Sequence, residues 1–201
     1  MKIPTTEHTA RPWLIHELTP DFTVEDVWAL PTPGGPDDFP RLLDGIGSTD
    51  FPEGAPAVVR VLWDLRWRLG ALFGWDRPDR GLGVRAGSLR ERLPAELRDG
   101  PTGADLPRFD SLYLRDDEWA AELANGTVHA VLHLGWVPDG SGGHRGQMAV
   151  LVKPNGVFGR AYMAAIKPFR YAFVYPALMR TFARGWEART PTAGDPTPTG
   201  K

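Results

Sequence analysis

Two histidines four residues apart are the first candidates for chemistry in this sequence. His129 and His133 lie in the stretch HAVLH, which superficially resembles the zinc-binding HExxH motif but lacks its glutamate. That motif also needs a helix, whereas these histidines alternate with apolar residues as in a strand. Four strand positions span ~13 Å, too far for two side chains to share one metal ion. We therefore predict no metal, which leaves packing, a surface position or lone acid/base chemistry in a pocket.

The residues around the histidines predict which way they point. The face with His129 and His133 also carries Thr127, Val131 and Gly135. The alternate face is more apolar and consists of Val128, Ala130, Leu132, Leu134 and Trp136. Because the more apolar face of a strand meets the core, we expect the histidines to point outward. Trp136 and, in the next strand, Met148 would then pack in the core or line a pocket wall.

Other familiar chemical motifs are missing. The stretch GLGVRAG (81–87) lacks the third glycine of a dinucleotide fingerprint, a strand before it and a helix after it. There is no GxSxG and no recognisable set of nucleophile, base and acid. The sequence has no cysteine, which excludes disulfides, thiolate metal sites and a cysteine nucleophile. We therefore assign no catalytic residue and no cofactor.

Composition narrows the class of protein. The 201 residues are 42% hydrophobic and 24% charged, and the formal net charge is −2. These values suit one globular domain and give no basic footprint for nucleic acid. No apolar run approaches the ~20 residues that span a bilayer, and the N-terminus has no signal-peptide pattern. We expect a flexible arm (1–10), one domain (11–189), a disordered tail (190–201) and a cytoplasmic location.

Periodicity predicts the order of the elements. Residues 13–18 read as a short strand and 19–30 as a helical or extended piece, followed by a proline-rich loop and a short helix capped at Asp37 or Asp38. A helix is expected over 55–75, and a short one within 88–101. An antiparallel meander follows, with a hairpin turn at Asn125-Gly126. Its strands are expected at 109–115, 118–125, 127–138 and 144–154, and residues 155–189 return to helical spacing.

This order of elements matches a helix-grip architecture, and four blocks of sequence carry a family resemblance. The blocks are RPWLIHELTPDFTVEDVWALPTPGGPDDFPRLL, LRWRLGALFGWD, SLRERLP and YMAAIKPFRYAFVYPALMR. Together, over roughly residues 11–188, they resemble the bacterial DUF2867 family. The resemblance implies a START-like (SRPBCC) α+β fold, in which a curved antiparallel sheet grips a long C-terminal helix, with additional helices after the first strand. Such domains hold hydrophobic ligands between sheet and helix, but the family supplies no catalytic residues.

The C-terminal helix is the expected wall of the ligand cavity. Pro168 and Pro176 each remove a backbone donor and should bend it, which leaves room beneath it or curves it around a filled core. A cation near the bend, Lys167 or Arg170, would meet freed carbonyls, an acidic ligand group or solvent. The candidate ligand-binding residues are Trp136, Met148, Tyr162, Lys167, Phe169, Arg170 and Phe173.

Three functions follow from this interpretation. The leading one is a binding module that encloses a small hydrophobic molecule. The second is an enzyme that uses the same cavity for acid/base chemistry on a small organic substrate. The third, implied by fusions within the family, is a non-catalytic partner domain of an epimerase-like reductase. It predicts an exposed apolar patch that includes Trp63, Trp67 or Trp75.

Overall fold

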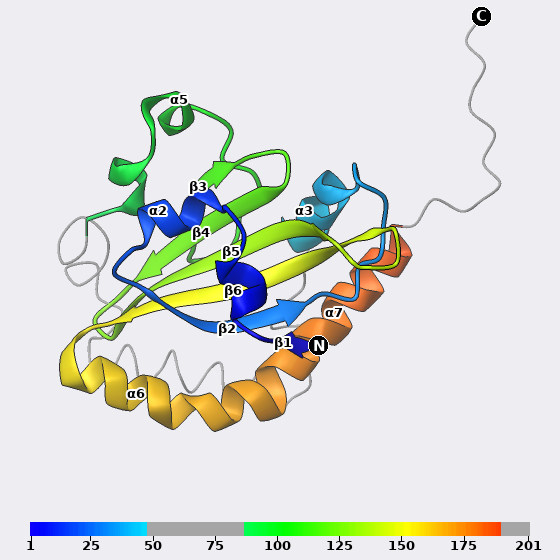
Figure 1. Ribbon diagram of the computed structural model, residues 1–201. Helices are drawn as coiled ribbons and strands as arrows, with labels where there is room; N and C mark the ends of the chain where they lie inside the picture. Colours follow the sequence, from blue (N-terminus) through cyan, green and yellow to red (C-terminus); the bar gives the residue numbers. More distant parts are fainter. Residues whose placement is uncertain (48–86, 190–201) are drawn as a thin grey trace, which may run out of the picture.

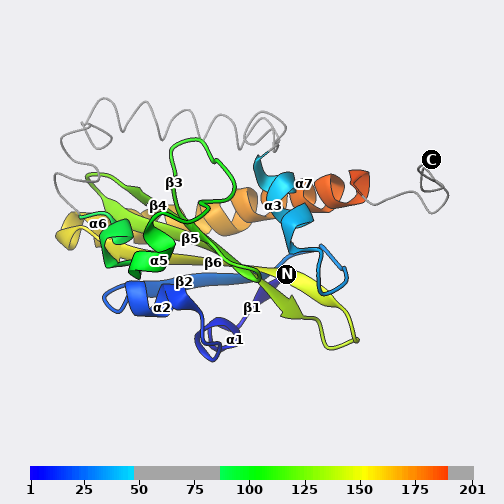
Figure 2. The ribbon, with the colours of Figure 1, turned by 90° about the horizontal axis from the view of Figure 1, so that it is seen from above.

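A six-stranded antiparallel sheet carries helices on both of its faces (Figures 1 and 2). The computed structural model describes residues 1–47 and 87–189. The strands are β1 (Lys2–Ile3), β2 (Thr23–Ala29), β3 (Asp110–Leu114), β4 (Glu118–Ala124), β5 (Val128–Pro138) and β6 (His144–Pro154). The helices are α1 (Thr6–Thr9), α2 (Leu14–Leu18), α3 (Phe39–Gly47), η2 (Leu89–Arg92), α5 (Ala95–Arg98), α6 (Gly156–Phe169), η3 (Arg170–Val174) and α7 (Tyr175–Ala188). The fold class is α+β, as predicted.

The predicted meander is confirmed. The strands expected over residues 109–154 are β3 to β6, and the sheet order is β1-β2-β6-β5-β4-β3. The Asn125 side chain accepts hydrogen bonds from the backbone N–H groups of Thr127 (2.9 Å) and Val128 (3.1 Å), which closes the β4–β5 turn. This turn fixes the register in which Glu118 lies opposite Gly135 and Ala124 opposite His129. The two long strands β5 and β6 form the middle of the sheet.

Both faces of the sheet are buried under helices. One face, which we call the histidine face, packs against α2 and η2. Its core consists of Trp13, Leu14, Ile15, Leu18, Val27, Leu89, Leu93, Leu112, Tyr113, Ala120, Val131, Val137, Ala149 and Leu151. The opposite face, which we call the α7 face, packs against α3 and α7. Its core consists of Trp28, Leu30, Phe39, Leu42, Leu43, Ile46, Trp119, Ala121, Leu134, Trp136, Met148, Tyr175 and Trp186.

The C-terminal helix bends where the prolines predict. A π-helical turn, η3, separates α6 from α7, and the helix changes direction there (Figure 1). Pro168 lies inside α6 and Pro176 in the first turn of α7. A proline cannot donate the i→i−4 hydrogen bond and its ring crowds the carbonyl four residues back, which a wider turn accommodates. The bend brings Tyr175, Ala177 and Trp186 of α7 into buried positions.

The N-terminal residues differ from the prediction. Residues 13–18, expected as a strand, are helix α2 preceded by Trp13, and Leu14, Ile15 and Leu18 are buried at helical spacing. The segment is too short for its period to decide between helix and strand, and a tertiary hydrogen bond to the Leu14 backbone N–H favours the helix. Residues 1–10, expected as a flexible arm, contain β1 and α1 and bury His8 completely. Residues 23–29 take the extended alternative as β2.

Of the other predicted helices, two are present and one lies outside the described residues. The short helix after Asp38 is α3, and the helical segment expected within 88–101 is present as η2 and α5. The helix expected over 55–75, almost all of the GLGVRAG stretch and the C-terminal tail lie outside the described residues, as do Trp63, Trp67 and Trp75.

One glycine allows α6 to approach the sheet. A Cβ on Gly159 would overlap the carbonyl oxygen of Thr127 and lie 3.2 Å from the carbonyl carbon of Pro154. Both neighbours are backbone atoms of the β4–β5 turn and the end of β6, so neither can move without shifting its strand. Gly159 is therefore a packing requirement for the start of the C-terminal helix.

Replacing Gly159 by alanine should destabilise the fold. We expect Gly159→Ala to lower the free energy of unfolding by about 1–3 kcal/mol, as overpacking against fixed atoms does. Gly185→Ala in α7 is the matched control, because its Cβ would meet only the end of the flexible Arg189 side chain, at 3.2 Å. The control should be neutral or stabilising, since alanine suits a helix better than glycine. Urea denaturation measures both variants, and equal stabilities would contradict the close approach of α6.

Candidate functional site

Two buried glutamate–histidine pairs lie beside each other on the histidine face. Glu118 and Glu122 are four residues apart on β4, and His133 and His129 are four apart on β5. His133 Nε2 lies 3.1 Å from Glu118 Oε2, and His129 Nε2 lies 2.7 Å from Glu122 Oε2. In the strand register each histidine is two positions diagonal from the residue opposite its glutamate. The same polar pairing thus occurs twice across the same two strands.

Each glutamate also holds the beginning of a covering helix. The backbone N–H of Leu14, the first residue of α2, lies 3.2 Å from both oxygens of Glu118. The backbone N–H of Leu89, the first residue of η2, donates to Glu122 Oε2 at 3.2 Å, and Ser88 Oγ donates to Glu122 Oε1 at 2.5 Å. Helices leave these first N–H groups without partners of their own. The two carboxylates therefore attach both helices to the sheet.

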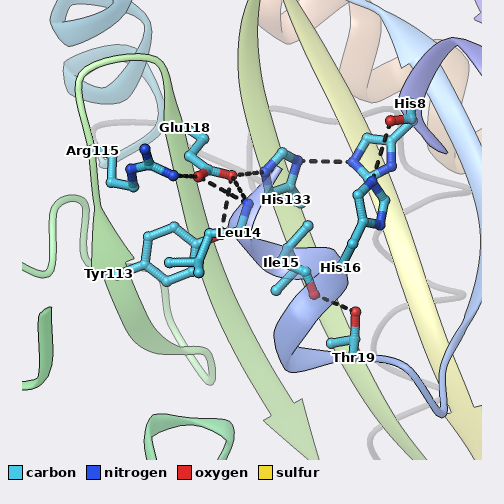
Figure 3. A network of polar contacts seen from close by, with 9 residues as sticks. All are labelled: His8, Leu14, Ile15, His16, Thr19, Tyr113, Arg115, Glu118 and His133. Atoms are coloured by element: carbon cyan, nitrogen blue, oxygen red, sulfur yellow. Dashed lines mark hydrogen bonds and ion pairs between the residues drawn. The ribbon is translucent and has the colours of Figure 1, made fainter. Parts of the chain in front are cut away.

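Glu118 is surrounded by donors (Figure 3). Besides Leu14 and His133, it accepts hydrogen bonds from Arg115 Nη1 at 2.6 Å and the Tyr113 hydroxyl at 3.3 Å. Burial by itself raises the pKa of Glu118, but the hydrogen bond from His133, the Leu14 N–H and the Arg115 guanidinium outweigh it and hold that pKa below its ordinary value. Burial raises the pKa of Tyr113, so its hydroxyl stays a donor. Glu118 is therefore an ionised carboxylate whose charge Arg115 balances.

A second histidine extends this contact. His8 Nε2 lies 3.0 Å from His133 Nδ1, and the rings meet edge to face with centroids 4.9 Å apart. Burial lowers the pKa of His133. Burial, more than the nearby His133, His16 and Arg11, lowers the pKa of His8 to about 2. With both rings neutral, the directions are fixed: His133 Nε2–H donates to Glu118, and His8 Nε2–H donates to His133 Nδ1.

The prediction that the histidines point outward is wrong. His129 is 5% exposed and His133 is fully buried, because the N-terminal residues and η2 cover the face that carries them. The argument from apolarity assumed one buried face, whereas this sheet has two. On the less apolar face, burial is tolerated because Glu118 and Glu122 satisfy the ring nitrogens.

A cleft opens beside Glu118, at the end of the sheet where β4 begins and β5 ends. Its volume is about 360 Å³. Its walls combine tryptophan and proline surfaces with charged groups. It is lined by Arg11, Pro12, Trp13, Pro36, Arg115, Asp117, Glu118, Trp136, Pro138 and His144. The Arg11 guanidinium lies 5.9 Å from the centroid of the Trp13 ring, within the range of a cation–π contact.

The basic residues predicted at the helix bend face acidic residues of β2. Arg170 Nη2 lies 2.6 Å from Oδ2 of Asp26, which is fully buried. The hydroxyls of Tyr171 and Tyr175 also donate to Asp26. Lys167 Nζ, on a side chain that is 53% exposed, lies 3.8 Å from Glu25. An acidic group does therefore meet Arg170, but it belongs to the protein's own sheet, and it holds the bent helix on the α7 face.

The other predicted ligand-binding residues are spread over the α7 face and the C-terminal helix. Trp136 is buried, donates from Nε1 to the Gly35 carbonyl at 2.9 Å and borders the cleft. Met148 is packed in the core of the α7 face at 1% exposure. Tyr162 is half-buried on α6, whereas Phe169 and Phe173 are 49% and 38% exposed. Where α7 packs on α3, the pocket between them is open to one side and has a volume of only about 10 Å³, room for one water.

Several residues of the site were not identified from the sequence. They are His8, Arg11, Asp26, Arg115, Glu118 and Glu122. One signal was available for two of them: the Asn125-Gly126 turn sets a register in which Glu118 and Glu122 share a sheet face with His133 and His129. The contribution of His8 and Arg11 had no such signal, because it depends on how the first residues fold back over the sheet.

The part of the chain that the structure describes contains neither a metal-binding cluster nor a membrane-spanning helix. In residues 1–47 and 87–189, no three histidine or acidic side chains are grouped so that they could hold a metal ion. Over the same residues, none of the helices has the length and apolarity needed to cross a bilayer.

The fold and the site together define an α+β domain with buried carboxylates under its N-terminal helices and a bent C-terminal helix on the opposite face. The chain belongs to the DUF2867 family, described as a protein of unknown function, whose profile matches residues 18–177. The match includes both glutamate–histidine pairs, whereas His8, Arg11 and Trp13 precede it. No curated protein and no solved structure matches the chain.

The buried histidines should make stability depend on pH. Because the folded-state pKa values of His8 and His133 are lowered, only the unfolded chain takes up these protons as the pH falls below about 6.5. We expect the free energy of unfolding to be constant above that pH and to fall below it by up to about 1.4 kcal/mol per pH unit for each histidine. His8→Gln keeps a donor to His133 and removes one titrating group, so it should roughly halve the slope. Urea denaturation across this range tests the prediction, and a flat profile would contradict it.

Removing the charge of Glu118 should be costly. Glu118→Gln replaces an acceptor of several hydrogen bonds with an amide and leaves Arg115 without its counterion, so we expect a loss of about 3–5 kcal/mol. Asp117→Asn is the matched control, since the adjacent carboxylate is exposed and should change stability by no more than about 0.5 kcal/mol. Chemical denaturation gives both values, and similar small losses in both variants would show that Glu118 is not the anchor described here.

Proposed function

We propose that this domain binds a small, largely apolar molecule, and that the cleft beside Glu118 is its site. The observation that carries the proposal is the cleft itself: about 360 Å³ lined by two tryptophans and three prolines, with charged groups among them. Small-molecule sites in proteins are commonly ~300–1,000 Å³, with apolar walls and few polar groups that orient the ligand. The volume lies in that range, but the lining is more polar than usual, since Arg11, Arg115, Asp117, Glu118 and His144 make up half of it.

The walls indicate the chemistry of the ligand. Trp13 and Trp136 line the cleft with the small exposed part of each indole, 6% and 4% of the side chain. Arg115 is balanced by Glu118, which leaves the Arg11 guanidinium as the cation best placed to meet a polar group of the ligand. A flat apolar body with an anionic end would stack on the indole surfaces and place its charge near Arg11. Asp117, also in the lining, disfavours a second anionic group.

The helix-grip interpretation, with a START-like ligand cavity between the sheet and the C-terminal helix, stays a prediction. The bent helix over the antiparallel sheet supports it. In the described residues, however, Arg170 and Tyr175 are engaged with Asp26, and Met148 lies in a packed core. We therefore favour the cleft as the binding site.

Binding is favoured over acid/base catalysis by the state of Glu118. A general base needs a lone pair directed at its substrate. Glu118 accepts from four different residues and is fully buried, so its oxygens are committed to the protein. The partner-domain alternative depends on a predicted apolar patch that includes Trp63, Trp67 or Trp75, and these lie outside the described residues.

A pair of fluorescent probes tests the cleft. Anilinonaphthalene sulfonate is anionic, and N-phenylnaphthylamine has the same rings without the charge. We expect the sulfonate to bind saturably, and Arg11→Gln to weaken it about tenfold, the effect of losing ~1.4 kcal/mol. The same variant should change the affinity of the neutral probe much less, because the rings still contact Trp13 and Trp136.

Arg180→Gln is the matched control, because Arg180 is an exposed residue of α7 on a different element from the cleft. It should leave the affinities of both probes unchanged. Equal weakening by the two arginine variants would point to non-specific attraction, and absence of saturable binding of either probe would overturn the proposal.

A further inference from the structure

Among the buried side chains of the histidine face that the structure describes, three carry a polar atom without a hydrogen-bond partner, and the half-buried Arg145 carries a fourth, Nη1. The three buried atoms are His8 Nδ1, Trp13 Nε1 and Gln147 Oε1. Their side chains are 0%, 6% and 1% exposed, so bulk solvent does not reach them. Most buried polar atoms in folded proteins are satisfied, and an orphaned one costs roughly 1–3 kcal/mol. Three such atoms close together therefore indicate that a small molecule binds between them.

The three side chains lie around the same part of the sheet. Gln147 is opposite Gly135 in the β5–β6 register. The Trp13 ring covers Gly135: a Cβ there would lie 2.7 Å from Trp13 Cζ2 and 3.3 Å from Cε2, the atom bonded to Nε1. Opposed strand residues have Cβ positions only ~4.5–5.5 Å apart, so the Trp13 indole lies next to Gln147.

His8 lies beside Trp13 and Gln147 and completes the group of three side chains. Its ring centroid is 6.4 Å from that of Trp13. The preceding residue, Glu7, presents its carbonyl oxygen 3.5 Å from Gln147 Nε2. Helix α1 therefore lies over Gln147, beside the Trp13 ring.

The surroundings of the three atoms determine whether each one donates or accepts a hydrogen bond. Trp13 Nε1 can only donate. Gln147 Oε1 can only accept, and its amide orientation follows from the contact of Nε2 with Glu7. His8 Nε2–H donates to His133 Nδ1, which leaves Nδ1 of His8 as an acceptor. This last assignment depends on the ionised Glu118 at the other end, which accepts from His133.

We propose that His8, Trp13 and Gln147 form a binding site for one small neutral hydroxylic molecule, either water or an alcohol. A water matches all three atoms, since it donates to the two acceptors and accepts from the indole N–H. An alcohol hydroxyl matches the indole and one acceptor. An anion would face two acceptors, and a cation would face the indole N–H with Arg11 nearby. The site does not depend on the ligand of the cleft, although Trp13 borders both.

The sign of a stability change tests whether a guest is bound. Gln147→Leu keeps the side-chain volume and removes one acceptor. If a hydroxylic guest is held, the variant loses a hydrogen bond, and we expect the melting temperature to fall by about 2–4 °C. If the atoms are simply unsatisfied, the same change removes a buried unpaired acceptor, whose cost exceeds the value of the long 3.5 Å contact between Gln147 Nε2 and the Glu7 carbonyl, and the melting temperature stays unchanged or rises. That second result would overturn the proposal.

The Trp13 indole proton identifies the guest. Among the eight tryptophans, the Trp13 signal in protein carrying isotope-labelled tryptophan is the one missing from Trp13→Phe. A cross-peak from this proton to a long-lived water supports the water form of the site. A shift on adding benzyl alcohol, but not toluene, supports the alcohol form. If the proton shows neither response, the proposal fails, and it fails independently of whether the naphthalene probes bind in the cleft.

Discussion

An ionised carboxylate under a protein surface must be surrounded by donors, and Glu118 imposes this requirement on the N-terminal half of the fold. Its donors come from β3 (Tyr113), the β3–β4 connection (Arg115), β5 (His133) and the first residue of α2 (Leu14). Of these contacts, the hydrogen bond from the Leu14 N–H has the longest range, since it joins residues 104 positions apart in the sequence. Because an unpaired buried charge is far more costly than an exposed one, losing one of these contacts should destabilise the fold. Glu122 repeats the arrangement for η2 four positions further along the strand. The helices on this face are therefore attached by backbone hydrogen bonds to carboxylates as well as by apolar packing.

The cleft is a consequence of this anchoring. Holding the start of α2 also holds the residues just before it, and Arg11, Pro12 and Trp13 form one wall of the cleft. The opposite wall comes from the ends of β5 and β6, and Arg115 and Glu118 lie between them. The domain thus uses one buried charge both to fix its N-terminus and to shape the entrance to a binding site. On the opposite face, Asp26 has a comparable role, since its contacts with Arg170, Tyr171 and Tyr175 fix the bent helix.

The sequence was most informative where local rules decide the structure. The Asn125-Gly126 turn and strict alternation predict β3 to β6, and the two prolines predict the bend around η3. The strand prediction for residues 13–18 was wrong because a six-residue segment is too short to show a period, and its form is set by Glu118 more than 100 positions away. The prediction that His129 and His133 point outward was wrong for a related reason, because comparing the apolarity of the two faces of a strand cannot reveal that both faces are covered. Of the predicted ligand-binding residues, Trp136 borders the cleft, and its partners there, Arg11 and Trp13, are brought to it only by the folding of the N-terminus.

The carboxylate also determines what the buried histidines can do. If Glu118 were neutral, either nitrogen of His133 could carry the proton, and the free atom of His8 could be donor or acceptor. Burial lowers the pKa of His133 and outweighs the opposite effect of the ionised Glu118, so both rings stay neutral with one orientation of their protons. As a result, His8 donates to His133 and His133 donates to Glu118. The remaining nitrogen of His8, Nδ1, is an acceptor. This acceptor can orient a neutral hydroxyl but cannot readily take up a proton, because the charge would be buried beside Arg11 and His16. For that reason the same network that resembles a catalytic relay in its residue types is, in its electrostatics, suited to binding.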